Sequence, residues 1–283
     1  MGVRPDEVAI MHSDLLALGE ALPSPTPHLA ARRAGSVGYL IFNRPERRNA
    51  VSLEMWEAIP ALMRAFDEDP AIRAVVLAGA GDQAFIAGAD ISEFEGERNS
   101  AESAALYEER NSAAYRAIAE SPKSVIAMIH GFCIGGGMAI ALACDIRIAA
   151  EGSTFAIPAA RLGLAYPPEA MALLVRAVGP SRAKLILHTA RRFSSDEALA
   201  MGLVDLVAPR TELLARVGEL TDAISDNAPL TIAAANATID AVLGSFGLDD
   251  NARAAIARCF ASDDYREGRQ AFMEKRRPIF RGS

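Results

Sequence analysis

The sequence predicts an α/β protein with one core of alternating strands and helices, followed by a helical C-terminal region. Three observations lead to this fold class. Short runs of β-branched and apolar residues alternate with segments of helical period, as in parallel strands joined by crossover helices. After Pro209 the pattern is helical up to the last residues. A chain of 283 residues, 51% of them hydrophobic, is long enough to bury a single large core.

The elements follow in order along the chain. Apolar runs predict the strands, and periodic apolar positions after capping or glycine signals predict the helices. The predicted strands are 37–42, 74–78, 124–129, 145–149 and 203–207, and the predicted helices begin near residues 53, 101, 135 and 198. Ser194 and Glu197 have the spacing of a capping box. We therefore place the α/β core at residues 31–208 and the helical region at 209–283.

The first thirty residues predict an N-terminal extension that is partly flexible. They contain acidic residues and end in the proline-rich stretch 22–27, unlike a signal peptide, which needs a basic start and an uninterrupted apolar run. The uncharged span 124–144 approaches the length of a membrane helix. However, Gly131 and Gly135–Gly137 lie in its centre and favour a strand, a glycine loop and a helix, so no membrane segment is expected.

The net charge and the cysteines limit which binding partners, metal sites and cellular compartments we expect. The formal net charge of −7 gives no reason to expect binding to nucleic acid or to an anionic membrane. The three cysteines, Cys133, Cys144 and Cys259, form no CxxC pair and have no histidine at zinc-ligand spacing. An odd number of scattered cysteines favours a reducing compartment. We expect a cytoplasmic protein without a structural disulfide and without a metal site.

The segment 129–137 carries the strongest chemical signal. Its glycines follow a predicted strand and open a helix, where backbone can approach a ligand closely and the first amides lack helical partners. Such a position favours negative charge and is a candidate oxyanion site. On glycine content alone, a close-packed turn that binds nothing fits better. Neither GxGxxG nor GxxxxGK[ST] occurs, so the standard phosphate-binding loops are absent.

Several motifs together are more specific than this loop. They occur at 43–45, 49–50, 84–91, 130–137 and 143–145, and in this order and spacing they resemble the enoyl-CoA hydratase/isomerase (crotonase) family over about residues 35–283. The resemblance implies a crotonase-like (ClpP/crotonase) spiral of ββα units, with 209–283 as a helical trimerisation region. It also implies an acyl-CoA substrate, no metal or redox cofactor, and a homotrimer or a dimer of trimers.

By the same resemblance, the thioester oxygen would lie between the backbone N–H groups of Ala89 and Gly136. Two preorganised donors favour an enolate oxygen over the ground-state carbonyl. The resemblance also assigns coenzyme A contacts, for which solvated arginines and a solvated helix end are the alternatives. These positions are Arg47 and Arg48 near the phosphates, Ala50, Ala87, Asp90 and Ile91 along the adenine and pantetheine, and Phe280, in the same chain or a neighbouring subunit.

The sequence departs from the family at the two glutamates that hydratases use. Those positions are Ala139 and Ala159, whose methyl groups transfer no protons. General acid–base catalysis typically contributes about 10²–10⁴-fold, so classical hydration is not expected. Tyr166 resembles the tyrosine after the same Leu-Gly turn in methylmalonyl-CoA decarboxylases of this superfamily. Glu169 is the nearest alternative acid or base.

Three functions remain open at this point. The first is a crotonase-type enzyme that stabilises a thioester enolate. The second is a decarboxylase of malonyl-type acyl-CoA that uses Tyr166, since loss of CO₂ leaves an enolate without prior proton removal. The third is an acyl-CoA binding protein without turnover.

Overall fold

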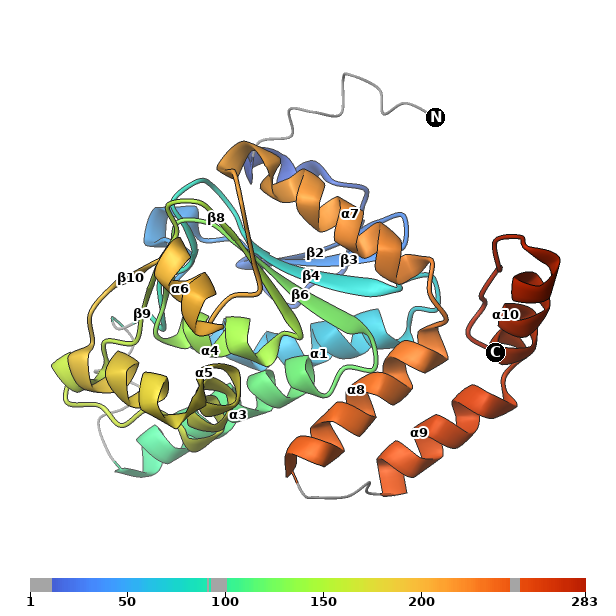
Figure 1. Ribbon diagram of the computed structural model, residues 1–283. Coiled ribbons are helices and arrows are strands. Elements are labelled where there is room, and N and C mark those ends of the chain that lie inside the picture. The colour runs from blue at the N-terminus through green and yellow to red at the C-terminus, as the bar shows by residue number, and fades with distance from the viewer. Residues whose placement is uncertain (1–11, 91, 93–100, 245–249) are drawn as a thin grey trace.

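A computed structural model describes residues 12–90, 92, 101–244 and 250–283. Two β-sheets form its centre, with helices packed around them (Figure 1). The larger sheet has the strand order β1 (Glu20–Leu22), β2 (Leu29–Ala34), β3 (Val37–Phe42), β4 (Ala74–Gly79), β6 (Ser124–Ile129), β8 (Ile146–Ala150), β11 (Leu206–Ala208). The smaller sheet has the order β10 (Phe193–Ser194), β9 (Thr154–Ala156), β7 (Phe132–Ile134), β5 (Ala84–Ile86).

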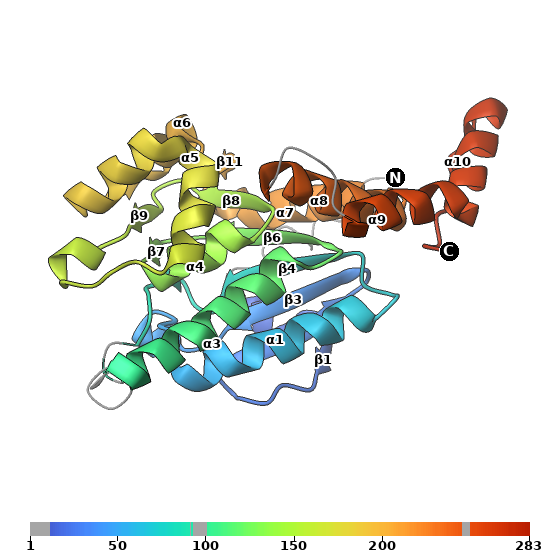
Figure 2. The ribbon, with the colours of Figure 1, turned by 90° about the horizontal axis from the view of Figure 1, so that it is seen from below.

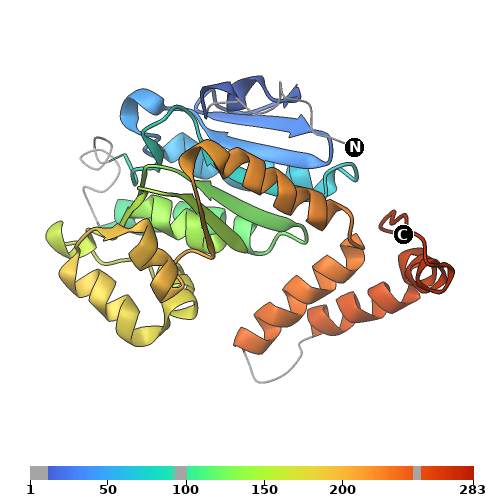
Figure 3. The same ribbon diagram turned by 45° about the horizontal axis from the view of Figure 1, so that its top comes forward.

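The helices divide between the core and the C-terminal region. They are α1 (Leu53–Glu68), α3 (Ala101–Ala119), α4 (Gly136–Ala143), α5 (Pro168–Thr189), α6 (Ser195–Met201), α7 (Leu213–Ser225), α8 (Pro229–Gly244), α9 (Asp250–Ala261) and α10 (Asp263–Glu274). Short 3₁₀ turns occur at His12–Ala17, Pro45–Arg47, Ala159–Arg161 and Arg210–Glu212. From α8 onwards the chain leaves the sheets, and α10 lies at the far end of the molecule (Figure 3).

The large sheet is buried on both faces, which explains its continuous apolar strands. Successive side chains of β4 point to opposite faces. Val75 and Leu77 pack in the core with α1, α3 and α4, whereas Val76 and Ala78 pack against Leu213 of α7 and its neighbours. Figure 2 shows α1 and α3 side by side below the sheet, and Figure 1 shows α7 across its other face.

The core repeats a strand–strand–helix unit, which confirms the predicted fold class. In β4–β5–α3, β6–β7–α4 and β8–β9–α5, the first strand joins the large sheet and the second joins the small sheet. Strands β4, β6 and β8 pair in parallel, and so do β5, β7 and β9. Because neighbouring parallel strands end at the same edge, the loops after β5 and β7 lie next to each other.

The N-terminal segment departs from the expectation of an extension. Residues 1–11 lie outside the described residues, but β1 pairs with β2, and β2 crosses the predicted boundary at residue 30. Leu15 and Leu29 are buried. The proline-rich stretch looks like a linker in the sequence, yet it connects the edge strand β1 to its antiparallel neighbour β2. This segment completes the edge of the large sheet.

Near the end of the core, the structure has the capping box and the following helices that the sequence predicts. The Ser194 hydroxyl accepts the Glu197 N–H at 3.2 Å, and the Glu197 carboxylate accepts the Ser194 N–H at 2.9 Å, which completes the capping box of α6. Helices α7 to α10 follow Pro209. None of the described helices is both long enough and apolar enough to cross a membrane.

Gly137 of α4 allows this helix to lie close against β5 of the small sheet. A Cβ on Gly137 would lie 2.4 Å from the Ile86 carbonyl oxygen of β5. We expect Gly137→Ala to destabilise the fold by about 1–3 kcal/mol, the usual cost of overpacking, measured by urea unfolding. Gly218→Ala in α7, where nothing lies within 4 Å of the added Cβ, is the control and is expected to be neutral or stabilising. Equal stability of Gly137→Ala and wild type would contradict this packing.

Candidate functional site

A cavity of about 130 Å³ lies where the loops after β5 and β7 meet α1, α3 and the segment before α5. Its walls are mainly apolar and aromatic, and come from five separate parts of the chain. The lining residues are Trp56, Ala87, Gly88, Ala89, Tyr107, Asn111, Tyr115, Ile134, Gly135, Gly136, Ile157, Pro158, Ala159, Leu162, Leu164, Ala165, Tyr166 and Pro167. Concave apolar sites with a few polar groups are the usual form of small-molecule sites.

The loop after β5 presents Ala89 to this cavity. Two backbone hydrogen bonds of 2.9 Å hold its neighbours to Val51, one from the Val51 N–H to the Gly88 oxygen and one from the Asp90 N–H to the Val51 oxygen. Gly88 has a φ of +116°, which favours glycine. Within the part of the chain that the structure describes, no hydrogen bond uses the Ala89 N–H.

The loop after β7 presents Gly136 to the same cavity. Gly135 has φ +53° and ψ −109°, and Gly136 is the first residue of α4, so its N–H has no partner within the helix. Among the described residues, this N–H also has no other partner. A Cβ built on Gly136 would lie 3.4 Å from the Ala89 nitrogen. Two unused amides therefore border one part of the cavity.

Buried polar groups anchor the loop that carries Ala89. Arg44 forms an ion pair of 2.9 Å with Asp90, and both side chains are nearly buried. Asp90 also accepts the N–H and the hydroxyl of Ser92. Burial favours a raised pKa for Asp90, but the hydrogen bonds from Ser92 and the Arg44 ion pair outweigh it and lower this pKa below its ordinary value. The Asp90 side chain, expected at coenzyme A, thus holds the loop in place.

The Asn49 side chain also holds the loops around Ala89 in place. Its carboxamide nitrogen donates to the carbonyl oxygens of Ala80 and Ala84 at 2.9 and 2.8 Å. Its carboxamide oxygen accepts the Arg44 N–H at 3.0 Å. Asn49 is buried with a φ of +57°, a conformation that asparagine tolerates better than most residues. Its side chain therefore links the turn before α1 to β5.

The two alanines at the expected glutamate positions have different surroundings. Ala159 lines the cavity, whereas Ala139 is fully buried inside α4 and is not among the lining residues. Neither contributes a group that transfers protons. Among the described lining residues there is no Asp, Glu, His, Lys or Arg.

Tyr166 and Glu169 lie on different surfaces. The Tyr166 hydroxyl donates to the Gly135 carbonyl oxygen at 3.3 Å, at the cavity wall. Burial, followed by Tyr115 and Cys133 nearby, raises the pKa of this phenol well above its ordinary value. Glu169 is exposed and lines a second cleft of about 300 Å³ with Arg116, Arg176 and Asp240 among others.

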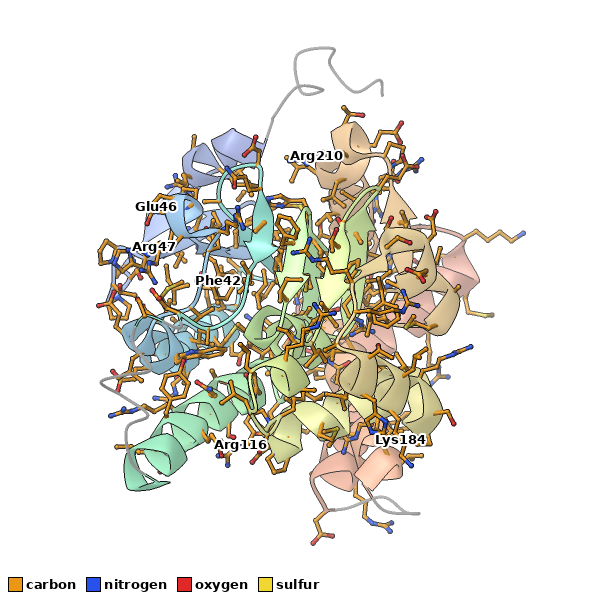
Figure 4. All side chains as sticks on the ribbon, turned by 90° about the vertical axis from the view of Figure 1, so that its left-hand side faces the viewer. Phe42, Glu46, Arg47, Arg116, Lys184 and Arg210 are labelled. Carbon is orange, nitrogen blue, oxygen red and sulfur yellow. The ribbon has the colours of Figure 1, made fainter. Side chains whose placement is uncertain are left out.

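Of the predicted coenzyme A contacts, some lie at the cavity and others lie away from it. Ala87 lines it and donates its N–H to the Arg48 oxygen at 3.0 Å, which brings the turn of Arg47, Arg48 and Ala50 near its entrance. Arg47 and Arg48 are exposed, and Figure 4 shows Arg47 reaching outward from the turn before α1. Arg48 lies over the Phe132 ring at 5.6 Å.

Two other predicted contacts are not at this entrance. Phe280 follows α10, which Figure 2 shows at the opposite end of the ribbon from α4 and α5, and Arg73 donates to the Phe280 carbonyl oxygen at 3.0 Å. Within one chain it does not reach the cavity. Ile91 lies outside the described residues.

Sequence reasoning missed the polar and aromatic wall on α1 and α3. The Trp56 indole N–H donates to the Tyr107 hydroxyl at 3.1 Å, and the Trp56 ring meets the Tyr115 ring edge to face at 5.5 Å. Asn111 lies between the two tyrosines. The spacing of Tyr107, Asn111 and Tyr115 places them on one helical face, and this pattern in an alanine-rich helix is the signal that identifies the wall. Arg192, also missed, lies over the Phe132 ring with Arg48.

Metal ligands are not gathered at this site. Over the described ranges, no three His, Cys, Asp or Glu side chains are grouped so as to hold a metal ion. Cys133 is buried, and burial raises the pKa of its thiol. The chemistry that the arrangement offers is therefore hydrogen bonding by backbone amides and neutral side chains.

Comparisons with known proteins show the family of this chain. The family described as Enoyl-CoA hydratase/isomerase matches residues 32–283. The Crotonyl-CoA hydratase of Syntrophomonas wolfei is 35% identical over 85% of this chain and 93% of its own length. The Short-chain-enoyl-CoA hydratase of Clostridium acetobutylicum is 34% identical over 87% of this chain and 94% of its own.

A solved structure shows the same architecture. The crystal structure of an enoyl-CoA hydratase/carnithine racemase from Magnetospirillum magneticum superposes with a TM-score of 0.87 at 33% identity, covering 92% of this chain and 97% of the other. The match therefore extends over most of this chain. This chain belongs to the enoyl-CoA hydratase/isomerase (crotonase) family.

Proposed function

We propose that this enzyme binds acyl-CoA thioesters and stabilises the thioester enolate between the N–H groups of Ala89 and Gly136. The observation that carries the proposal is the pair of unused amides at one cavity. Donors fixed before the reaction need no reorganisation when charge develops on the oxygen. Removing one such donor typically costs on the order of 10²–10³-fold in turnover.

Coenzyme A binding fits the entrance of the cavity. Ala87, Ala50 and the backbone around Asp90 are proposed to follow the pantetheine and adenine, with Asp90 positioning the loop through Arg44. Arg47 and Arg48 supply local positive charge that a chain of net charge −7 lacks overall. Guanidinium groups suit phosphates because their hydrogen bonds are bidentate and charge-assisted.

Tyr166 is proposed as a positioning residue for the oxyanion hole. It donates to the Gly135 oxygen, which belongs to the same peptide group as the Gly136 N–H. In a trans peptide the C=O and N–H point in opposite directions, so the phenol and the bound thioester oxygen lie on opposite sides of that peptide. Hydrogen bonds in such a chain polarise one another and strengthen the donor. The raised pKa keeps the phenol protonated.

Proton transfer is where this enzyme is proposed to differ from classical hydratases. Ala139 and Ala159 offer no carboxylate, and Glu169 lines the second cleft. The hydratase reaction by two glutamates is therefore not proposed. Enolate stabilisation needs none of these side chains.

A decarboxylase of malonyl-type thioesters is the second candidate. The observation in its favour is that the described lining holds Tyr166 but no carboxylate base, because CO₂ loss requires no base in its first step. A third candidate, binding without turnover, is supported by the same two alanines. Incubation with crotonyl-CoA, methylmalonyl-CoA and acetoacetyl-CoA separates the three through hydration, CO₂ release and binding alone. Absence of turnover with every thioester would contradict the enzyme proposal.

Assembly into trimers, or dimers of trimers, is proposed on the basis of the C-terminal helices. These helices and the segment after α10 leave large apolar side chains exposed, namely Ile239, Val242, Leu243, Phe260, Met273 and Ile279. Exposed apolar surface of this kind is typical of interaction sites. In such an assembly Phe280 would be available to a neighbouring cavity.

The oxyanion proposal predicts a large effect of Gly136→Ala. The added Cβ would lie 3.3 Å from the Trp56 ring and 3.4 Å from the Ala89 nitrogen, in the space that the thioester oxygen needs. We expect kcat/KM to fall about 10²–10³-fold with little change in thermal stability. Gly218→Ala is the matched control and should keep full activity. Wild-type activity in Gly136→Ala would contradict the assignment.

We expect the substitution Ala159→Glu to increase hydratase activity. Hydration of crotonyl-CoA by the wild type is expected to be slow, and Ala159→Glu places a carboxylate at the cavity wall. We expect the hydration rate to rise about tenfold or more, since one general acid or base contributes about 10²–10⁴-fold. Ala160→Glu, on an exposed neighbour, controls for added charge. Rapid hydration by the wild type would show that another group replaces the glutamates.

Tyr166→Phe distinguishes a positioning role from proton transfer. We expect kcat to fall about three- to tenfold, the effect of one neutral hydrogen bond, with KM nearly unchanged. The pH–rate profile should keep its shape, because a phenol of raised pKa stays protonated through neutral and mildly alkaline pH. The assay uses the thioester of the panel that turns over fastest. A loss of 10²-fold or more, with a missing limb of the profile, would contradict the positioning role.

A further inference from the structure

We propose that Asn111 is a specificity-determining residue, whose carboxamide binds a hydroxyl group on the acyl chain and makes the site favour uncharged, hydroxylated acyl chains over alkyl and carboxylate ones. This inference rests on the proposed function and adds a residue with a stated role to it. It begins with the face that α3 presents to the cavity. Tyr107, Asn111 and Tyr115 follow one another at intervals of four residues, and all three line the cavity.

Asn111 is a buried polar side chain of this face with hydrogen-bonding capacity left. The residue is 4% exposed, and among the described residues its carboxamide oxygen is buried without a hydrogen-bond partner. Buried polar groups are nearly always paired in native proteins, so an unpaired one at a cavity wall is a place where a ligand atom can bind. Rotation about the last side-chain bond exchanges the oxygen and the NH₂ group, so the carboxamide can offer an acceptor or a donor.

The polar neighbours of Asn111 already have partners. The Tyr107 hydroxyl accepts the Trp56 indole N–H, and the Tyr166 hydroxyl donates to the Gly135 oxygen. The Tyr115 ring packs on Trp56. These contacts hold the walls on both sides of Asn111, so its carboxamide faces a preformed space.

The lack of charged side chains in the described cavity wall favours an uncharged acyl chain. In the described part of the lining there is no charged side chain, and Arg116 and Glu169 line the second cleft, which shares Tyr115 with the cavity. A carboxylate on the acyl chain would lose its water without gaining a cation, which is costly. A plain alkyl chain would leave the Asn111 carboxamide unpaired. A hydroxyl both donates and accepts, and so matches the carboxamide without adding charge.

Equilibrium binding of acyl-CoA thioesters to the purified protein tests whether Asn111 binds a hydroxyl group of the acyl chain. Isothermal titration compares butyryl-CoA, 3-hydroxybutyryl-CoA, 4-hydroxybutyryl-CoA and succinyl-CoA, which share the coenzyme A part. We expect at least one hydroxylated thioester to bind about three- to tenfold more tightly than butyryl-CoA, as one added neutral hydrogen bond gives. Succinyl-CoA is expected to bind more weakly than butyryl-CoA.

Variants of α3 assign any preference to Asn111. Asn111→Leu, of similar size, should lose the preference for a hydroxyl, so that hydroxylated thioesters and butyryl-CoA bind this variant about equally. Asn111→Ala is the second variant, should the leucine fail to fold. Ser112→Ala is the matched control, because Ser112 is the buried next residue of α3 and does not line the cavity; it should keep the preference.

The outcomes separate this inference from the proposed function. Equal binding of hydroxylated thioesters and butyryl-CoA, a preference that survives in both Asn111 variants, or binding of succinyl-CoA as tight as that of the hydroxylated thioesters would each overturn the role of Asn111. Each of those results leaves acyl-CoA binding intact. Failure of every thioester to bind would instead overturn the proposed function.

Discussion

The parallel pairing of β5 with β7 is the constraint on which the site depends. Both strands are short, and each ends in the loop that carries one of the two unused amides. Parallel neighbours end at the same sheet edge, so Ala89 and Gly136 reach one cavity although 47 positions separate them in the sequence. The close approach of Gly137 to Ile86 lets α4 lie close against β5. The site is thus a property of backbone geometry more than of side-chain identity.

Charge in this molecule serves mainly to hold that geometry. Arg44 and Asp90 lie close to the cavity, yet they bind each other and the loop backbone. Removing one partner of such a nearly buried pair typically costs about 3–5 kcal/mol, because the other charge is left uncompensated. Inside the described cavity the polar groups are neutral. This separation suits a site in which an oxygen becomes negative, since fixed amide dipoles act strongly where water and mobile charges are few.

The sequence predicts the core of the fold well, because strand cores and capping signals are local. The strand at 124–129 and the capping box at Ser194 and Glu197 match the structure. The edge strand β1 and its neighbour β2 are missed because the proline-rich stretch between them looks like a linker. The wall on α3 is missed for another reason, since Tyr107 and Tyr115 at helical spacing look like ordinary core residues. Glu169 lies near Tyr166 in sequence, but the start of α5 directs it to the second cleft.

Ala139 and Ala159 raise the question of how this family member transfers protons without the two glutamates. In the proposed function, two amides and a protonated tyrosine stabilise an enolate, and proton transfers use water or groups of the substrate, because the described lining holds no carboxylate. The most direct test is isotope-edited infrared spectroscopy of a bound acyl-CoA labelled with ¹³C at the thioester carbonyl. The account predicts a carbonyl stretch clearly below its position in water, with the shift reduced in Gly136→Ala. A stretch at the same position as in water, in both proteins, would contradict it.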